Sequence, residues 1–268
     1  MRTLTGFYDV AGHPQGENAL VVCGHVSEKR KWERFEHEWK QALTDADVAG
    51  PFHMTDFMSC AKTFDGWKPR VADRAKLLTT LISIIKRNTY KAFLEVVLLN
   101  DWRAVNENYQ LQESRCTPYA LGGFFIMDRT IRWWGKKHPH DSMTNFVFEE
   151  GDKNKGDFMW MMESVIRQDR SVLGVAKPRF EPKGLAPLQA ADLAGWTMRR
   201  ATRVWLTGEQ ERSIPRPVVE ALIALQHVPH RAASLNRGNI EKFCNDHGIP
   251  RRGESAGWSG PVRSNATV

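Results

Sequence analysis

Residues 186–196 read APLQAADLAGW and place one carboxylate, Asp192, in the middle of a segment built mostly from Ala, Leu and Gly. Pro187 is tolerated in the first turn of a helix, so we predict a helix from about residue 187 to residue 205. Small residues allow such a helix to approach another layer closely. The acid then either faces solvent or is held where a neighbouring group needs it. The choice depends on whether carboxylates that are distant in the sequence meet Asp192.

Strands and helices alternate along the rest of the chain. Hydrophobic periodicity predicts strands at 3–9, 18–26, 90–99, 144–152 and 171–180, an extended piece at 50–57, and helices at 69–87, 118–137 and 155–168. Ser27 is expected to cap a further helix whose apolar face carries Trp32, Phe35, Trp39 and Leu43. The Gly- and Pro-containing linker between the first two strands indicates a hairpin.

This alternation predicts an α/β fold in which helices pack on a mixed sheet. No internal repeat divides the chain. We expect one domain over residues 1–230 and a basic, flexible C-terminal extension over residues 231–268, whose end is rich in Gly, Ser, Pro and Arg.

The composition is that of a soluble protein, with 41% hydrophobic and 26% charged residues. No apolar run approaches the roughly 20 residues that a membrane span needs, and the first residues contain no apolar export signal. The four cysteines are scattered without a C-x-x-C pair, which argues against a structural zinc site. We therefore expect a cytoplasmic protein with no membrane segment.

The net charge of +7 is concentrated towards the C-terminus, because residues 199–268 hold 11 Lys or Arg against 6 Asp or Glu. A basic excess attracts phosphate-rich partners such as nucleic acid. A charged, solvated surface without such a partner is the alternative.

Acidic residues stand at the ends of predicted elements. Asp9 ends the first strand, Glu149 and Glu150 end the strand FVFEE, and Asp192 lies on the late helix. Mg²⁺ and Mn²⁺ prefer oxygen ligands, and two such ions about 3.5–4 Å apart can activate a water and stabilise the leaving oxygen in phosphodiester cleavage. Each acid also has a simpler interpretation, since Asp9 can start a turn, Asp192 can face solvent, and neighbouring strand residues point to opposite faces.

Four segments in this order, FYDVAGH, PFHMTDF, FVFEEGD and PLQAADLAGW, resemble the bacterial and phage "domain of unknown function 3800" family over about residues 3–205. That family typically opens with Asp-Glu-Ser-Gly and closes with Leu-Gln-x-Ala-Asp-Leu. The closing motif is intact at residues 188–193. The opening motif keeps Asp9 and Gly12 but has Val10 and Ala11 in place of Glu and Ser. The resemblance implies a ribonuclease H-like fold.

The resemblance also extends to His53, which matches a histidine of the family and would assist proton transfer beside a metal-bound phosphate. A structural hydrogen bond is the alternative role. Arg199 and Arg203 follow Asp192 by seven and eleven residues on about the same helix face, and they would bind a nucleic-acid backbone unless they form a solvated surface.

Our first hypothesis is a metal-dependent phosphodiesterase (nuclease) that acts on nucleic acid. Asp9, Glu149 (or Glu150) and Asp192 would hold Mg²⁺ or Mn²⁺. The second hypothesis, motivated by Val10, is a catalytically degenerate nucleic-acid-binding or regulatory protein on the same scaffold. The third is a protein-interaction module in a toxin or phage-defence system, which is the family's usual setting. No nucleophile elbow or phosphate-binding glycine loop supports a Ser, Cys or Lys nucleophile.

Overall fold

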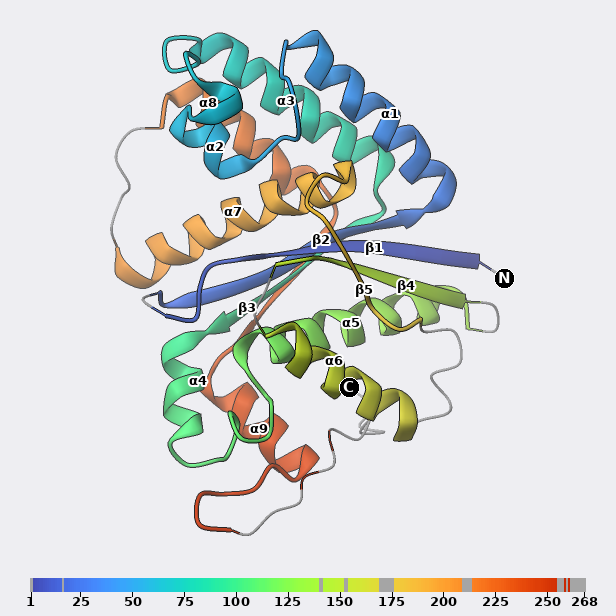
Figure 1. Cartoon of the computed structure of the whole chain (residues 1–268), viewed down its shortest axis with the longest axis vertical. Helices are drawn as coiled ribbons and strands as arrows, with labels where there is room; N and C mark the ends of the chain where they lie inside the picture. Colours follow the sequence, from blue (N-terminus) through green and yellow to red (C-terminus); the bar gives the residue numbers. More distant parts are fainter. Residues whose placement is uncertain are drawn as a thin grey trace.

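The computed structural model describes residues 2–15, 17–139, 142–151, 154–168, 176–208, 214–254, 258 and 260. Within these residues, a mixed sheet of six strands lies between two layers of helices (Figure 1). The α/β class and the mixed sheet predicted from the sequence are therefore confirmed. None of the described helices combines the length and the apolar character needed to cross a membrane.

The sheet has the strand order β5-β4-β1-β2-β3-β6. Neighbours pair in parallel except that β2 is antiparallel to both β1 and β3, so the expected hairpin is present and β2 runs against the other five strands. The carboxyl ends of β1 and β4 consequently lie next to each other. The strand bounds are β1 (Arg2–Ala11), β2 (Ala19–Glu28), β3 (Lys91–Leu98), β4 (Ser142–Glu149), β5 (Arg179–Glu181) and β6 (His230–Leu235).

Helices cover both faces of the sheet, and each face has its own apolar core. The first layer contains α1 (Lys29–Asp45), α2 (Met54–Ser59), α3 (Val71–Asn88), α7 (Ala186–Thr207) and α8 (Arg216–Ile223), with the short 3-10 helices η1 (Lys62–Phe64) and η2 (Ala224–His227). The second layer contains α4 (Leu99–Asn106), α5 (Pro118–Lys137), α6 (Lys155–Gln168) and α9 (Arg237–His247). Because both faces are covered, nearly all of β2 is buried.

The start of α1 differs from the prediction. Its apolar face is buried as expected, at Trp32, Phe35, Trp39 and Leu43. Ser27, however, belongs to β2, and its hydroxyl donates to the Asn88 carbonyl oxygen at 2.7 Å instead of capping the helix. Pairing of Ser27 with Thr5 extends the strand beyond the predicted end.

Two other predicted elements are shorter than expected. The extended piece at 50–57 ends at His53, because α2 begins at Met54. The predicted strand at 171–180 is represented by β5 alone, and residues 171–175 lie outside the described part of the chain.

The folded domain continues beyond residue 230, inside the stretch predicted to be a flexible extension. β6 pairs with β3, and α9 buries Ile240 and Phe243 in the core. Trp258 donates from Nε1 to the His247 carbonyl oxygen at 2.8 Å. The rest of the predicted extension, at 255–257, 259 and 261–268, lies outside the described residues.

Helix α7 lies very close to β1 and β2. A Cβ atom at Gly195 would approach Cys23 Sγ to 2.9 Å and Ala11 Cβ to 3.1 Å. The Cys23 thiol donates to the Ala191 carbonyl oxygen at 3.3 Å. The small residues of the APLQAADLAGW segment therefore permit direct contact between helix and sheet.

We predict that Gly195→Ala lowers the free energy of unfolding. Overpacking a dense core typically costs about 1–3 kcal/mol, whereas replacing a helical glycine with alanine gains at most about 1 kcal/mol. Gly135→Ala is the matched control, because a Cβ at that position in α5 would have open space around it, with nothing within 4 Å beyond its own stretch of helix. Urea unfolding should show Gly195→Ala to be less stable and Gly135→Ala to be no less stable than the parent protein. Equal gains for both variants would contradict the close packing of α7.

Candidate functional site

The structure brings together three of the predicted acids on the α7 side of the sheet. Tyr8 pairs with Phe148 between β1 and β4, so Asp9 and Glu149 follow next on adjacent parallel strands. Asp192 lies on α7 above them. Both Asp192 and Glu149 act electrostatically on the Asp9 carboxyl.

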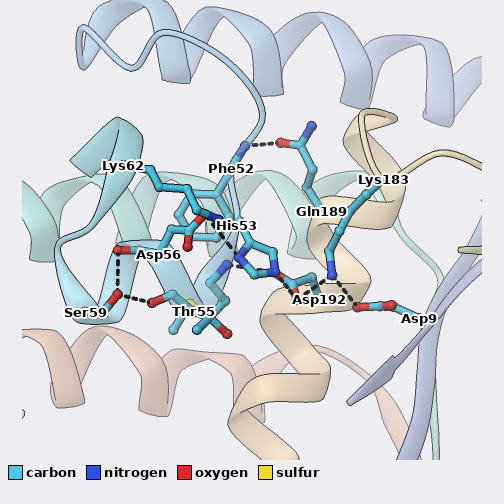
Figure 2. Close-up of polar contacts among 11 residues, drawn as sticks. Asp9, Phe52, His53, Thr55, Asp56, Ser59, Lys62, Lys183, Gln189 and Asp192 are labelled. Carbon is cyan, nitrogen blue, oxygen red and sulfur yellow. Dashed lines mark hydrogen bonds and ion pairs between the residues drawn. The ribbon is translucent and has the colours of Figure 1, made fainter. Parts of the chain in front are cut away.

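A lysine that the sequence interpretation missed lies between two of these acids. Lys183 is in the turn from β5 to α7, and its Nζ lies 3.3 Å from Asp192 Oδ1 and 3.7 Å from Asp9 Oδ2 (Figure 2). Burial lowers the pKa of Lys183, but the three acids outweigh burial and raise that pKa above its ordinary value. Lys183 therefore stays charged and partly neutralises the acids. No sequence pattern marks this lysine, because its position depends on the turn that joins β5 to α7.

Asp9 is the least satisfied of the three acids. It is only 1% exposed, and neither of its carboxylate oxygens accepts a hydrogen bond from any described residue. Burial raises the pKa of Asp9 well above its ordinary value; Lys183 opposes this effect, while Asp192 and Glu149 add to it. A protonated Asp9 can donate a hydrogen bond to Glu149, which raises the pKa further. The ionised form therefore lacks a sufficient counter-charge.

The α7 motif also anchors the segment that carries His53. Gln189 Oε1 accepts from the Phe52 backbone N–H at 2.8 Å and from Trp39 Nε1 at 2.9 Å. One turn later, Asp192 Oδ2 accepts from the Met54 backbone N–H at 2.6 Å, at the start of α2. The acid on this helix is thus held by the protein and does not belong to a solvated surface.

His53 lies at the rim of the acid cluster. Its Nε2 is 3.7 Å from Asp192 Oδ1, and its Nδ1 is 3.4 Å from Asp56 Oδ2. Asp56 in turn pairs with Lys62 Nζ at 3.1 Å. The His53 side chain is 30% exposed, so it reaches both the cluster and solvent. Proton exchange between them is chemically possible from this position.

The remaining predicted residues lie farther from the cluster's centre. Glu150 pairs with Lys155 Nζ at 3.5 Å, which favours Glu149 as the strand-end acid of the cluster. Arg199 lies 3.5 Å from Glu17 Oε2, near the loop between β1 and β2. Arg203 is half-buried on α7, about three turns beyond Asp192.

Val10 occupies the opposite face of the sheet from Asp9. It packs against the core formed with α5 and α6, as alternation along a strand requires. The family's opening motif has Glu where this chain has Val10. A side chain at this position points to the other face of the sheet from Asp9, so the missing Glu would not belong to the acid cluster. The cluster of Asp9, Glu149, Asp192 and Lys183 does not include position 10.

No group of three His, Cys, Asp or Glu side chains among the described residues is arranged to hold a metal ion as it stands. Asp9 and Asp192 instead share the ammonium group of Lys183. The donor chemistry nevertheless suits Mg²⁺ or Mn²⁺, because three carboxylates supply oxygen ligands and both Asp9 oxygens lack hydrogen-bond donors in the described part of the chain. A thiolate ligand is unsuitable here, since burial, Asp9 and Asp192 raise the pKa of the adjacent Cys23 thiol.

Comparison of the chain with protein-family models, with curated proteins and with solved structures gave no match.

We predict that Asp9→Asn stabilises the metal-free protein at neutral pH. Because the pKa of Asp9 is higher in the folded protein than its ordinary value of 3.8, folding favours the protonated form. The contribution of protonated Asp9 to the free energy of unfolding is complete below about pH 4. It is lost as the pH rises through the pKa of Asp9 in the folded protein. The variant has no proton to lose and should not show this loss.

Urea unfolding in EDTA at pH 7 and at pH 4 tests this expectation. Asp9→Asn should be more stable than the parent protein at pH 7, with a smaller difference at pH 4. Asp246→Asn is the control, because Asp246 pairs with Lys242 at 2.8 Å on α9, on the other side of the sheet. Destabilisation by Asp9→Asn at pH 7 would mean that the ionised carboxylate is well satisfied.

Proposed function

We propose that this protein is a metal-dependent phosphodiesterase that cleaves nucleic acid, with a divalent cation bound at Asp9, Glu149 and Asp192. The observation that carries the proposal is the state of Asp9. Its carboxylate is buried, lacks hydrogen-bond donors among the described residues, and faces two further acids. Perturbed carboxyl groups of this kind are concentrated at functional sites.

Charge balance supports a divalent cation. The cluster holds three carboxylates and one ammonium group, which leaves two negative charges when all groups are ionised. Burying a carboxylate whose charge is only partly compensated is unfavourable, so Asp9 is expected to take up a proton or to gain a cation. Mg²⁺ and Mn²⁺ carry the missing charge, prefer oxygen ligands, and are satisfied by a few carboxylates and water.

The chain's own groups then have distinct tasks. Asp9, Glu149 and Asp192 would hold the cation, which when bound supplies an acidified water and stabilises negative charge on phosphate oxygens. Lys183, 32% exposed beside Asp9 and Asp192, would bind a phosphate oxygen by its positive charge. His53, at the rim, would deliver a proton to the leaving oxygen.

Three further observations support this proposal. The resemblance to the domain of unknown function 3800 family implies a ribonuclease H-like fold, and a mixed sheet with helices on both faces is compatible with it. The basic excess after residue 199 suits a polyanionic substrate, for which Arg199 and Arg203 remain proposed contacts. All four cysteines are free, which is compatible with the cytoplasm that we propose as its location.

The position of Lys183 favours a second candidate, a nucleic-acid-binding or regulatory protein without catalytic activity. An ammonium group between Asp9 and Asp192 neutralises part of the charge that would otherwise attract a metal ion. In that case the cluster stabilises the turn before α7 and the segment that precedes α2.

Calorimetric titration with Mn²⁺ separates the two candidates. The parent protein should bind Mn²⁺, and Asp9→Asn and Asp192→Asn should each weaken binding by at least about tenfold, the loss expected even for a residue that only supports a metal ligand. Asparagine at position 192 can still accept the hydrogen bond from Met54, so the fold is retained. Asp246→Asn on α9 is the control and should bind Mn²⁺ as the parent does.

Cleavage of labelled single- and double-stranded DNA and RNA in Mn²⁺ then tests the reaction itself. We expect cleavage by the parent protein and by Asp246→Asn, and none by Asp9→Asn. Absence of Mn²⁺ binding and of cleavage, together with salt-sensitive binding of polynucleotide in EDTA, would overturn the enzyme and support the second candidate. Mn²⁺ binding that both cluster variants leave unchanged would rule out this cluster as the metal site.

A further inference from the structure

A cavity of about 470 Å³ lies beside the C-terminal part of α7, beyond the carboxylate cluster. Its walls come from the sheet, from α7, from α8 and from η2, and include Leu94, Ala194, Met198, Leu222 and Leu225. The volume falls within the range of about 300–1,000 Å³ that small-molecule sites occupy. Its lining is mainly apolar with few polar side chains, which is also typical of such sites.

One polar side chain of this cavity, His25, is poorly hydrogen-bonded, because its one backbone contact, to the Ala190 carbonyl, is weak. His25, on β2, is 1% exposed, and neither ring nitrogen makes a hydrogen bond with good geometry to the described residues. Burial lowers the pKa of His25 to about 4, opposed only in part by the Ala190 carbonyl. The imidazole is therefore uncharged at neutral pH and offers one donor and one acceptor.

An imidazole with one weak backbone contact and one unsatisfied ring nitrogen is unfavourable next to an apolar cavity. Buried polar groups almost always have partners, and an unmade hydrogen bond destabilises the fold. A single water could reach the ring, but the remaining apolar volume offers it few other polar groups. Apolar side chains also remain exposed along the same cavity, with Ile223 at 49% and Val219 at 37%.

We propose that this cavity binds a small, neutral, mostly apolar molecule whose hydroxyl group forms a hydrogen bond with His25. A hydroxyl can donate and accept, so it suits either tautomer of the ring. A carboxylate is disfavoured beside His25, because it would be buried next to an uncharged group. The charged lining residue Arg200 lies on α7, with its guanidinium 5.7 Å from the Trp196 ring.

Two matched probes test the proposal directly. p-Cresol and toluene share the ring and the methyl group and differ only in the hydroxyl. In calorimetric titrations of the whole chain, p-cresol should bind, and toluene should bind roughly five- to tenfold more weakly, the difference expected for one hydrogen bond. Failure of both probes to bind at millimolar concentration, or equal binding of the two, would overturn the proposal.

Two variants locate the site. His25→Leu removes the ring nitrogens and should abolish the preference for p-cresol, while its melting temperature should be equal to or above that of the parent. A lowered melting temperature would mean that His25 already has a partner within the protein.

Ala201→Phe adds a ring at an exposed cavity position and should weaken the binding of both probes without affecting folding. Unchanged p-cresol binding by Ala201→Phe would place the ligand elsewhere and overturn the proposal, whether or not His25→Leu folds.

Discussion

Helix α7 approaches β1 and β2 so closely that the 2.9 Å between Cys23 Sγ and a Cβ built at Gly195 is too short for a methyl group. Asp192 lies about one turn before Gly195, so this contact sets the position of its carboxylate above the sheet. From the same turn, Gln189 and Asp192 accept backbone hydrogen bonds from the segment that includes His53. Helix, sheet and loop are thereby fixed relative to one another, and the acid cluster forms at the place where they meet.

The ionised form of Asp9 opposes stability. Asp9 is buried beside like charges, and Lys183 supplies only one compensating charge. Proteins retain such unfavourable arrangements mainly where function requires them. A buried, undercompensated carboxylate is ready to bind a cation, because binding removes an existing electrostatic penalty. The same reasoning applies to His25, whose uncharged and poorly hydrogen-bonded ring faces an apolar cavity.

Elements with strong periodic patterns could be predicted from the sequence, and α5 and α6 have the predicted bounds of 118–137 and 155–168. β6 was missed because only Leu235 in it is buried, so pairing with β3 determines the strand rather than its own pattern. α9 did carry a readable signal in the N-cap Asn236 and the apolar residues that follow. For the site, the strand patterns predicted Asp9 and Glu149 near the ends of two strands, but only the pairing of β1 with β4 shows that these strands are neighbours. Lys183 could not be predicted, because its position depends on how the turn after the three-residue β5 meets α7.

Our proposal requires that Asp9, Glu149 and Asp192 together bind one divalent cation. Diffraction from crystals soaked in Mn²⁺, collected where manganese scatters anomalously, locates the ion without reference to activity. We expect an anomalous peak among these three carboxylates, with Lys183 Nζ moved away from at least one of them. The opposite result is an ordered cluster in which Lys183 still lies between Asp9 and Asp192, with no anomalous peak beside it at millimolar Mn²⁺. That result would rule out a metal site at these carboxylates.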